Sequence, residues 1–239
     1  MDFLLELDAR IFLFFNSFHT PLLDTFMPLF SGRFTWVPLY LALIVYLLRT
    51  YGGKTTLVFV LAIALAVTVS DQVCASIIRP AVERLRPSNL DNPLSLVTIV
   101  VDGYRGGAYG FPSCHAANSF ALATTLAILV RRPKLTAFLF SWAIVNCYSR
   151  LYLGVHYPGD LLVGGAIGAM SACLICMAVC RLWSKKKRET HVPARPLTLH
   201  FPIKLASVGV KEMTIGITAS DLVIATGLTT VLLMLLASI

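Results

Sequence analysis

A series of long apolar stretches restricts the fold of this chain more than any other feature. Of its 239 residues, 57% are hydrophobic and only 13% are charged, whereas a water-soluble domain of this length carries about a quarter charged residues. Several of the apolar stretches approach the roughly 20 residues that a helix needs to cross a bilayer. The chain is therefore predicted to be one integral membrane domain and not two soluble domains.

Six apolar stretches are predicted to cross the membrane as helices. The more polar stretch before them is interpreted as one or two amphipathic helices that lie in the membrane interface. The predicted fold is thus an all-α, polytopic transmembrane helical bundle with about six spans and an N-terminal interfacial amphipathic helix. The predicted spans are residues 34–48, 55–78, 111–130, 135–153, 160–183 and 215–238.

The same pattern divides the chain into four predicted parts. The N-terminal interfacial helices occupy residues 1–33, and the main transmembrane bundle occupies residues 34–183. A basic linker on the cytoplasmic side follows at residues 184–213, and residues 214–239 form an additional C-terminal transmembrane helix.

Basic residues predict the orientation of these spans, because Lys and Arg concentrate in the cytoplasmic loops of membrane proteins. We place the basic run at residues 185–188 in the cytoplasm. Alternation then puts the turns at residues 49–54 and 131–134 on the same side, together with every lysine of the chain. Loops that face anionic lipid explain the net charge of +8. The bilayer is therefore the expected partner, and no nucleic acid is expected.

Neither the cysteines nor the carboxylates within the spans indicate a metal site. Five of the six cysteines lie in predicted helices, where cysteine acts as a small apolar residue. The Cys173-x2-Cys176 pair has no histidine or acidic neighbour in its apolar run. Asp71 and Asp221 lie in or near apolar helices, where carboxylates are functional candidates, but the serine before each one favours local hydrogen bonding. We expect no metal and no disulfide framework.

Three short polar segments interrupt the apolar pattern. They are residues 79–87 (RPAVERLRP), residues 112–115 (PSCH), and the pair SR at 149–150 followed by HYPGD at 156–160. Each segment lies at the end of an apolar stretch, and the predicted topology puts all three on the extracytoplasmic side. Segments that are far apart in the sequence are therefore expected to meet at one membrane face.

The first two segments contain groups that bind phosphate. Arginine presents a planar, charged fork that matches two phosphate oxygens. Arg79 and Arg86 are seven residues apart, so they share a face if the segment is helical. Ser113 opens a predicted helix, and backbone N–H groups at a helix N-terminus form an anion site. His115 in the same turn can protonate a leaving oxygen.

The third segment contains a candidate nucleophile. A carboxylate such as Asp160 that binds one imidazole nitrogen of His156 leaves the other nitrogen free to attack. Each segment also has a simpler explanation: arginines can pair with lipid headgroups or Glu83, Ser113 can be an N-cap, and Asp160 can cap a helix. The combination of the three segments at one face favours phosphate-ester chemistry.

Together the segments resemble the type 2 phosphatidic acid phosphatase family, which shares its catalytic core with vanadium haloperoxidases. The family pattern is Lys-x6-Arg-Pro, then Pro-Ser-Gly-His, then Ser-Arg-x5-His-x3-Asp. This chain has Arg79-x6-Arg86-Pro87, Pro112-Ser113-Cys114-His115 and Ser149-Arg150-x5-His156-x3-Asp160. The likeness covers about residues 55–183. Arg79 replaces the usual lysine and Cys114 the usual glycine, and both departures bear on phosphate geometry and substrate preference.

The resemblance implies that residues 34–183 form an enzyme that hydrolyses a lipid phosphate without a metal or other cofactor. It implies His156 as the nucleophile that forms a phosphohistidine, Asp160 as the group that holds its tautomer, and His115 as the proton donor that later activates water. The implied phosphate ligands are Arg79, Arg86, Ser113, Cys114 and Arg150. The loop at residues 79–110 is expected to form a headgroup rim through Asn89, Asp102, Tyr104 and Arg105.

The residues leave the lipid substrate open. By family frequency, the resemblance favours undecaprenyl pyrophosphate, followed by lipid A, and then phosphatidylglycerol phosphate or phosphatidate. The expected location is the cytoplasmic (inner) membrane, with the active site on the extracytoplasmic, periplasmic side. Two other classes of function stay open: a lipid-linked phosphotransferase that uses the same histidine, and a non-catalytic lipid transporter or scaffold.

Overall fold

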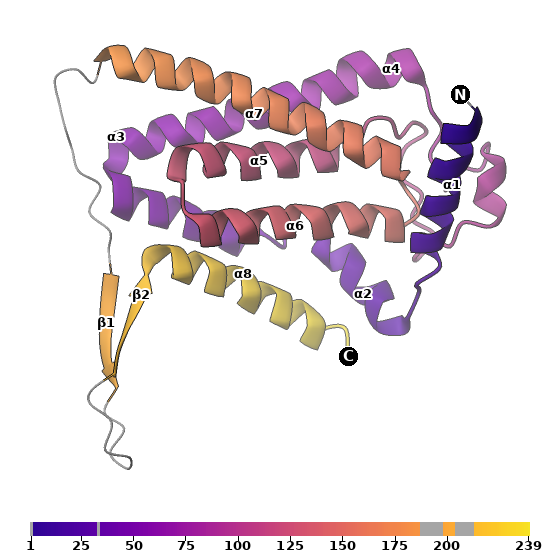
Figure 1. Cartoon of the computed structure of the whole chain (residues 1–239). Helices are drawn as coiled ribbons and strands as arrows, with labels where there is room; N and C mark the ends of the chain where they lie inside the picture. The colour runs from indigo at the N-terminus through magenta and orange to yellow at the C-terminus, as the bar shows by residue number, and fades with distance from the viewer. Residues whose placement is uncertain (1, 33, 187–197, 204–212) are drawn as a thin grey trace.

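The computed structural model describes residues 2–32, 34–186, 198–203 and 213–239, and Figure 1 shows their arrangement. Most of these residues are helical. The α-helices are α1 (Asp2–Asn16), α2 (Pro21–Phe30), α3 (Val37–Gln72), α4 (Arg79–Val82), α5 (Cys114–Val130), α6 (Pro133–Tyr152), α7 (Pro158–Lys186) and α8 (Ala219–Leu236). The other elements are the π-helix η1 (Val73–Ile78), the 3₁₀-helix η2 (Pro93–Leu96), and the strands β1 (Thr198–Ile203) and β2 (Met213–Thr218).

Helix α3 is two antiparallel arms joined by a sharp turn. Gly52 has φ 75° and ψ 166°, a conformation that glycine adopts without steric cost. The chain reverses direction there, and the second arm continues through η1 into α4 (Figure 1). Residues of both arms line the same cavity, including Leu47 before the turn and Val60 after it. The turn falls between the predicted spans at residues 34–48 and 55–78.

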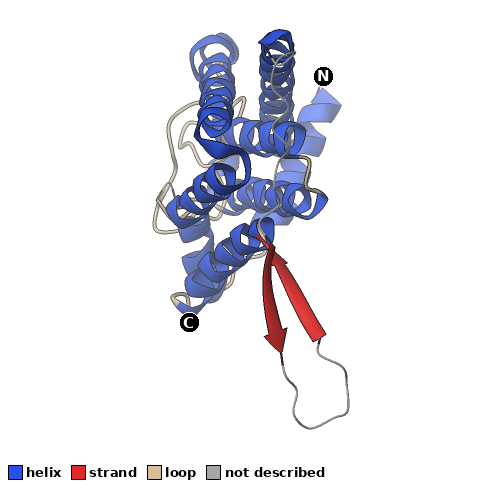
Figure 2. Cartoon of the chain, turned by 90° about the vertical axis from the view of Figure 1, so that its left-hand side faces the viewer, coloured by secondary structure: helices blue, strands red, loops and turns tan. Residues whose placement is uncertain are grey.

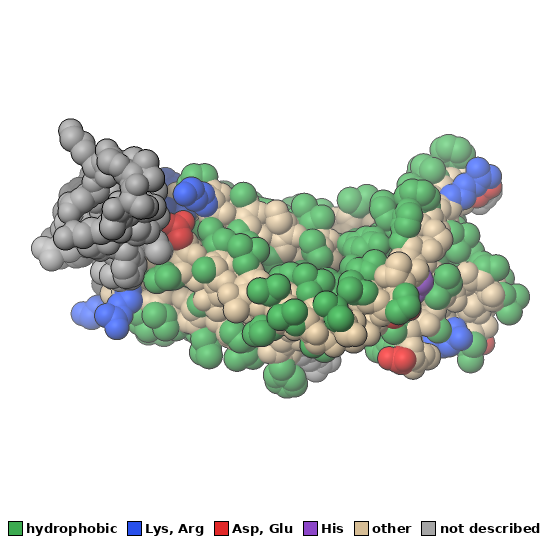
Figure 3. Space-filling model, turned by 90° about the horizontal axis from the view of Figure 1, so that it is seen from below, with side chains coloured by type: hydrophobic (Ala, Val, Ile, Leu, Met, Phe, Trp, Pro, Cys, Tyr) green, Lys and Arg blue, Asp and Glu red, His purple; other side chains and the backbone are tan. Residues whose placement is uncertain are grey.

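The bundle has a basic end and an end that carries the polar motifs. The turn of α3, the connection between α5 and α6 and the end of α7 lie together at the left of Figure 1, and these are the basic turns of the sequence. The loop after α4 and the first turns of α5 and α7 lie at the other end, where α1 crosses the ends of the helices. On the face seen in Figure 3, many hydrophobic side chains and few charged ones lie between the two ends.

Length and hydropathy distinguish the helices of the bundle from one another. Three described helical stretches are long and apolar enough to cross a membrane: Val37–Val82, which contains the Gly52 turn, Pro158–Leu182 and Ala219–Leu236. Helix α5 is apolar but has only 17 residues. Helix α6 carries polar side chains such as Asn146 and Arg150, which are buried inside the bundle.

The bundle confirms the predicted all-α membrane fold, with a two-stranded antiparallel hairpin as an addition. Strands β1 and β2 pair from Thr198 opposite Thr218 to Ile203 opposite Met213, and they extend away from the helices (Figure 2). The hairpin overlaps the predicted linker at residues 184–213, of which residues 187–197 and 204–212 lie outside the described residues. Helix α8 starts at Ala219, later than the predicted residue 215, because Thr218 and Asp221 form a capping box.

Helices α5 and α7 pack closely because small residues face each other. A Cβ added at Gly164 would collide with the carbonyl oxygen of Ser113, and one added at Gly168 would collide with that of Ala117. Glycine at such positions allows the backbones of membrane helices to approach closely. This contact sets the first turn of α5 beside the first turn of α7, and both turns carry polar motif residues.

Gly168→Ala should therefore separate α5 from α7. We expect the variant to lose about 1–3 kcal/mol of stability, the usual cost of overpacking, and to lose activity because its polar motifs move apart. Gly53→Ala is the matched control, since a Cβ at Gly53 meets nothing within 4 Å. Thermal unfolding in detergent measures the difference, and equal midpoints for the two variants would contradict this account of the packing.

Candidate active site

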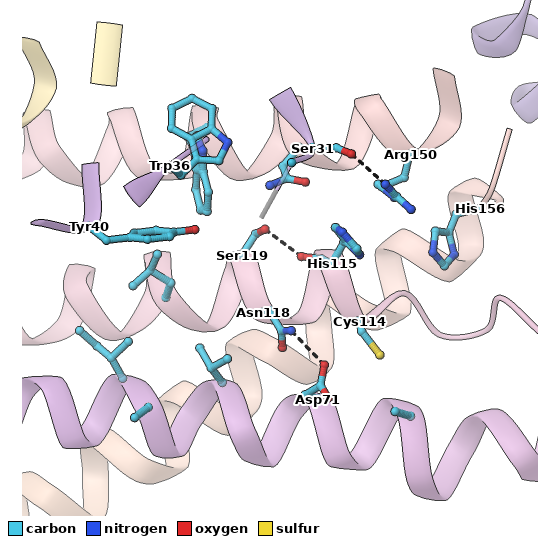
Figure 4. A pocket seen from close by; sticks show the side chains of 18 of the residues that line it. Ser31, Trp36, Tyr40, Asp71, Cys114, His115, Asn118, Ser119, Arg150 and His156 are labelled. Carbon is cyan, nitrogen blue, oxygen red and sulfur yellow. Dashed lines mark hydrogen bonds between the residues drawn. The ribbon is translucent and has the colours of Figure 1, made fainter. Parts of the chain in front are cut away.

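The three polar segments meet at one end of a cavity inside the bundle. The cavity has a volume of about 830 Å³ and lies among α3, α5 and α6. Figure 4 shows His115 and His156 at its polar end, with Arg150 beside them. Six of the eight predicted catalytic and phosphate-binding residues line it: Arg79, Arg86, Cys114, His115, Arg150 and His156. Ser113 and Asp160 are fully buried beside this group.

The imidazole of His156 is held in one tautomer. Its Nε2 lies 2.9 Å from Nη1 of Arg86, and its Nδ1 lies 3.3 Å from Oδ2 of Asp160. A guanidinium can only donate hydrogen bonds, so Nε2 accepts and Nδ1 carries the proton. His156 is 2% exposed. Burial and the charges of Arg86, Arg150 and Arg79 hold its pKa well below the ordinary value. The imidazole is thus neutral at physiological pH, and the lone pair of Nε2 is directed at Arg86.

Three arginines, the buried Arg86 and Arg150 and the half-buried Arg79, surround the polar end of the cavity with incomplete hydrogen bonding. Arg79 donates to the carbonyl oxygen of Pro112 at 2.9 Å, and Arg86 donates to the carbonyl oxygen of Val155 at 2.8 Å. Among the described residues, the Nε groups of Arg79, Arg86 and Arg150 have no hydrogen-bond partner. Buried donors without acceptors are costly, and arginine forks suit phosphate oxygens. The geometry therefore provides a site for an anion.

The three guanidinium groups also repel one another. Burial, Arg79 and Arg150 lower the pKa of Arg86 to about 10. Arg86 still carries its charge at neutral pH, so the cluster keeps three positive charges in a largely buried space. Arg150 donates to Ser31 Oγ at 2.8 Å and to the Tyr104 hydroxyl at 3.3 Å, which fixes it at the edge of the site. A phosphate dianion would relieve this repulsion.

The residues at the start of α5 have different roles in the site. Ser113 caps the helix, because its Oγ accepts the Ala116 N–H at 3.4 Å, and it does not line the cavity. Cys114 places its Sγ 3.0 Å from Nη2 of Arg79. His115 lines the cavity, and Ser119 one turn later donates to its carbonyl oxygen at 2.8 Å. The side chain of Ser113 is thus an N-cap, which is the simpler of the two roles predicted for it.

Of the four expected rim residues, only Tyr104 lines the cavity. The others build the surrounding loop. Asn89 accepts the backbone N–H of Asp91 at 2.8 Å, and Arg105 donates to the carbonyl oxygen of Ser88 at 2.6 Å. Asp102 is exposed in a turn with φ 48°.

A hydrogen-bonded chain that the sequence analysis did not find supports Asp160. Arg84 donates through Nη1 to Asp160 at 3.0 Å and through Nη2 to Asp8 at 2.8 Å. Asp8, on α1, also accepts the backbone N–H of Gly159 at 2.7 Å. Asp160 accepts the Tyr157 N–H at 3.0 Å, so it binds His156 and caps α7 at the same time. Arg84 lies within the first motif, but no sequence signal connects Asp8 to the site.

The site residues are thus suited to bind a phosphate and to present an unprotonated nitrogen to it. Among the residues that the structure describes, no three His, Cys, Asp or Glu side chains are grouped so as to hold a metal ion. A neutral imidazole beside three cations, at one end of a cavity within a membrane bundle, defines a phosphate-transfer or phosphatase site that acts on amphiphiles.

The comparison with protein families agrees with a phosphate-transfer or phosphatase site. The model of the PAP2 superfamily matches residues 54–187, which is more than half of the chain, and the chain belongs to this superfamily. It is a membrane lipid phosphatase, and phosphatases of this kind are phosphoric monoester hydrolases.

Curated relatives and solved structures extend the likeness to most of the chain. The lipid A 4'-phosphatase of Bacteroides thetaiotaomicron is 46% identical over 82% of this chain and 87% of its own length. The lipid A 4'-phosphatase of Porphyromonas gingivalis is 36% identical over 70% and 71%. The crystal structure of Aquifex aeolicus LpxE has 25% identity, covers 70% of this chain and 93% of that one, and gives a TM-score of 0.51.

We expect Asp8→Asn to weaken the support of Asp160 without unfolding the protein, because an asparagine oxygen can still accept the Gly159 N–H. The charge that pairs with Arg84 is lost, so His156 is oriented less well. Phosphate release should fall about tenfold, within the range for small misplacements. Glu6→Gln on the same helix is the control, since Glu6 is exposed and, within the described part of the chain, pairs only with Arg10. An unchanged rate for Asp8→Asn would refute the positioning role.

The lowered pKa of His156 makes stability depend on pH in a defined direction. Below its ordinary pKa of about 6.5, the unfolded histidine takes up a proton that the folded one does not. Stability should therefore fall as the pH drops from 7 to 5, with up to ~1.4 kcal/mol per pH unit from this group. Unfolding of wild type and His156→Gln in detergent tests this: the variant should lose less stability over this interval.

Proposed function

We propose that this protein removes a phosphate group from lipid A at the extracytoplasmic face of the inner membrane, through a phosphohistidine on His156. One observation supports the chemistry: the unprotonated Nε2 of a buried, neutral His156 contacts Arg86, the charges of Arg79 and Arg150 lie near the ring, and the Nε donors of all three arginines have no partner among the described residues. The similarity to two lipid A 4'-phosphatases supports the substrate.

In the first step, Nε2 of His156 attacks phosphorus and the bond to the lipid oxygen breaks. Arg86 occupies Nε2 in the substrate-free site, so it must turn to the phosphate oxygens, which are stronger acceptors than a neutral imidazole. Asp160 then stabilises the positive charge that develops on the ring through Nδ1–H. His115 protonates the leaving lipid oxygen.

In the second step, His115 takes a proton from water, the hydroxide attacks the phosphohistidine, and inorganic phosphate leaves. Arg79, Arg86 and Arg150 stabilise the charge of the equatorial oxygens in both steps, which is most of the work in phosphoryl transfer. The side chain of Cys114, held near Arg79, replaces the glycine hydrogen of the family pattern, and its backbone N–H at the start of α5 adds a donor.

Lipid A is a better candidate than undecaprenyl pyrophosphate, which family frequency alone favours. A relative named undecaprenyl-diphosphatase, from Sulfolobus acidocaldarius, is 32% identical over 62% of the chain, a lower and shorter match than either lipid A 4'-phosphatase. The inner part of the cavity is lined by apolar residues such as Leu43, Ile63 and Leu126, which suit the hydrocarbon chains of a lipid.

The proposed side of the membrane follows from charge. The motif end of the bundle is opposite the basic turns, and basic loops prefer the cytoplasm. The active site would then open to the periplasm, at the depth where lipid headgroups lie.

Phosphate release by the purified protein in detergent with excess EDTA tests the proposal. Lipid A, undecaprenyl pyrophosphate, phosphatidylglycerol phosphate and phosphatidate form the panel. We expect lipid A to be the best substrate and His156→Ala to abolish release while leaving the protein folded. Near-normal release by His156→Ala would overturn the mechanism, and a preference for another lipid would overturn the substrate.

Two further results would distinguish a phosphatase from a phosphotransferase and from a transporter or scaffold. With labelled lipid A, rapid quenching of the wild-type reaction should trap labelled phosphate on His156, and His156→Ala should trap none. Transfer of that phosphate to an added lipid or sugar in preference to water would indicate a phosphotransferase. No phosphate release and no labelling, with folded protein, would indicate a transporter or scaffold.

A further inference from the structure

The side chains that line the cavity form layers along its length, because residues about four positions apart lie on the same face of each lining helix. On α6, Arg150, Asn146 and Trp142 line it in succession. Four helical residues rise about 6 Å, so Asn146 lies one turn deeper than the arginine and Trp142 two turns deeper. On α5, Asn118 and Ser119 lie one turn deeper than Cys114 and His115 (Figure 4).

The second layer is polar, although it lies below the phosphate site. On α3, Asp71 faces Asn118, whose Nδ2 donates to Asp71 Oδ1 at 3.0 Å. The Asn118 Oδ1 in turn accepts from Ser70 at 3.4 Å. Eight residues separate Asp71 from Arg79, about 12 Å along the helices. This carboxylate therefore lies too deep to be an interfacial group, and its partner is Asn118 on α5 and not the neighbouring serine.

The α6 wall of the cavity presents polar atoms without partners in this layer, at Asn146, and one turn deeper, at Trp142. The Oδ1 of Asn146 and the Nε1 of Trp142 have no hydrogen-bond partner in the described part of the chain. Asn146 is 7% exposed and Trp142 is 5% exposed, and both line the cavity. Polar groups that are buried without partners are costly, so such atoms in a cavity wall point to a ligand that satisfies them.

Beyond this layer the cavity becomes apolar. Leu122 and Leu126 continue the α5 wall, and Val67 and Ile63 continue the α3 wall. From its outer end inward, the cavity thus offers three cations, then hydrogen-bonding groups, then hydrocarbon. An amphiphile with a phosphate, a polar unit and acyl chains, in that order, matches this sequence of layers.

We propose that Asp71, Asn146 and Trp142 form a subsite for the sugar unit of the substrate, between its phosphate and its acyl chains. This inference rests on the proposed function and names the groups that select a glycolipid phosphate. Asp71 and the Asn146 Oδ1 accept hydrogen bonds, so the unit must carry donors, as the hydroxyl and amide N–H groups of an N-acylated sugar do. Trp142 donates to one of its oxygens.

The subsite explains discrimination against simpler lipids. A polyprenyl chain has no polar group at this depth, and the ester carbonyls of phosphatidate only accept hydrogen bonds. Either lipid would leave the Asn146 Oδ1 without a donor and Asp71 with Asn118 as its donor. A site built to hydrogen-bond its substrate rejects analogues that lack the matching group much more strongly than an apolar pocket does.

Asp71→Asn and Asn146→Leu test the subsite, because both replacements keep the size of the side chain and remove an acceptor. We expect kcat/KM for lipid A to fall about tenfold or more in each variant, the range for one lost hydrogen bond to a buried group. Hydrolysis of phosphatidate and of p-nitrophenyl phosphate should change by less than about threefold. Asp221→Asn, in the cap of α8 at the basic end, is the matched control and should behave as wild type.

The outcomes separate this inference from the proposed function. Wild type that releases no phosphate from lipid A but acts on phosphatidate would overturn both. Wild type that hydrolyses lipid A, with variants that lose all three substrates by the same factor, would leave the proposed function intact and assign Asp71 and Asn146 to catalysis or folding. Variants that retain full activity on lipid A would equally overturn the subsite, and thermal unfolding of each variant in detergent establishes that it is folded.

Discussion

The contact between Arg86 and Nε2 of His156 is the interaction on which the site depends. It places a positive charge against the lone pair that attacks phosphorus in the proposed mechanism, and together with burial it keeps the imidazole neutral. The same arrangement holds three guanidinium groups in a space where they repel one another. An anion would relieve this repulsion, so the proposed mechanism couples the binding of phosphate to the release of Nε2 from Arg86.

The rest of the fold keeps those charges together inside a membrane protein. The close approach of α5 and α7 at Gly164 and Gly168 sets two motif segments side by side. The chain from Asp160 through Arg84 to Asp8 then connects the nucleophile to α1, which crosses the ends of the helices. The N-terminal helix is therefore a structural part of the active site.

The polarity of the cavity changes with depth in the same order as that of a lipid. Cations lie at the outer end, Asp71, Asn118 and Asn146 lie one to two helical turns inside, and apolar side chains line the remainder. A helical bundle produces such layers directly, because side chains four residues apart share a face. The lining residues can therefore specify both the phosphate and the unit that carries it.

The sequence by itself determined the membrane fold, the three motifs and the end of the bundle at which they meet, because apolar length, basic turns and motif spacing are local signals. Only the tertiary structure decided that Ser113 serves as a helix cap, that Asp8 and Arg84 support Asp160, and that Asp71 lies in the cavity wall opposite Asn146. The roles of Asp8, Arg84 and Asp71 depend on contacts between residues 47 to 151 positions apart in the chain, and no periodicity or spacing reports which buried side chains face each other across a bundle. The structure also decided the hairpin of β1 and β2 and the start of α8. Helix α8 starts at Ala219 because the capping box at Thr218 outweighs the apolar pattern before it.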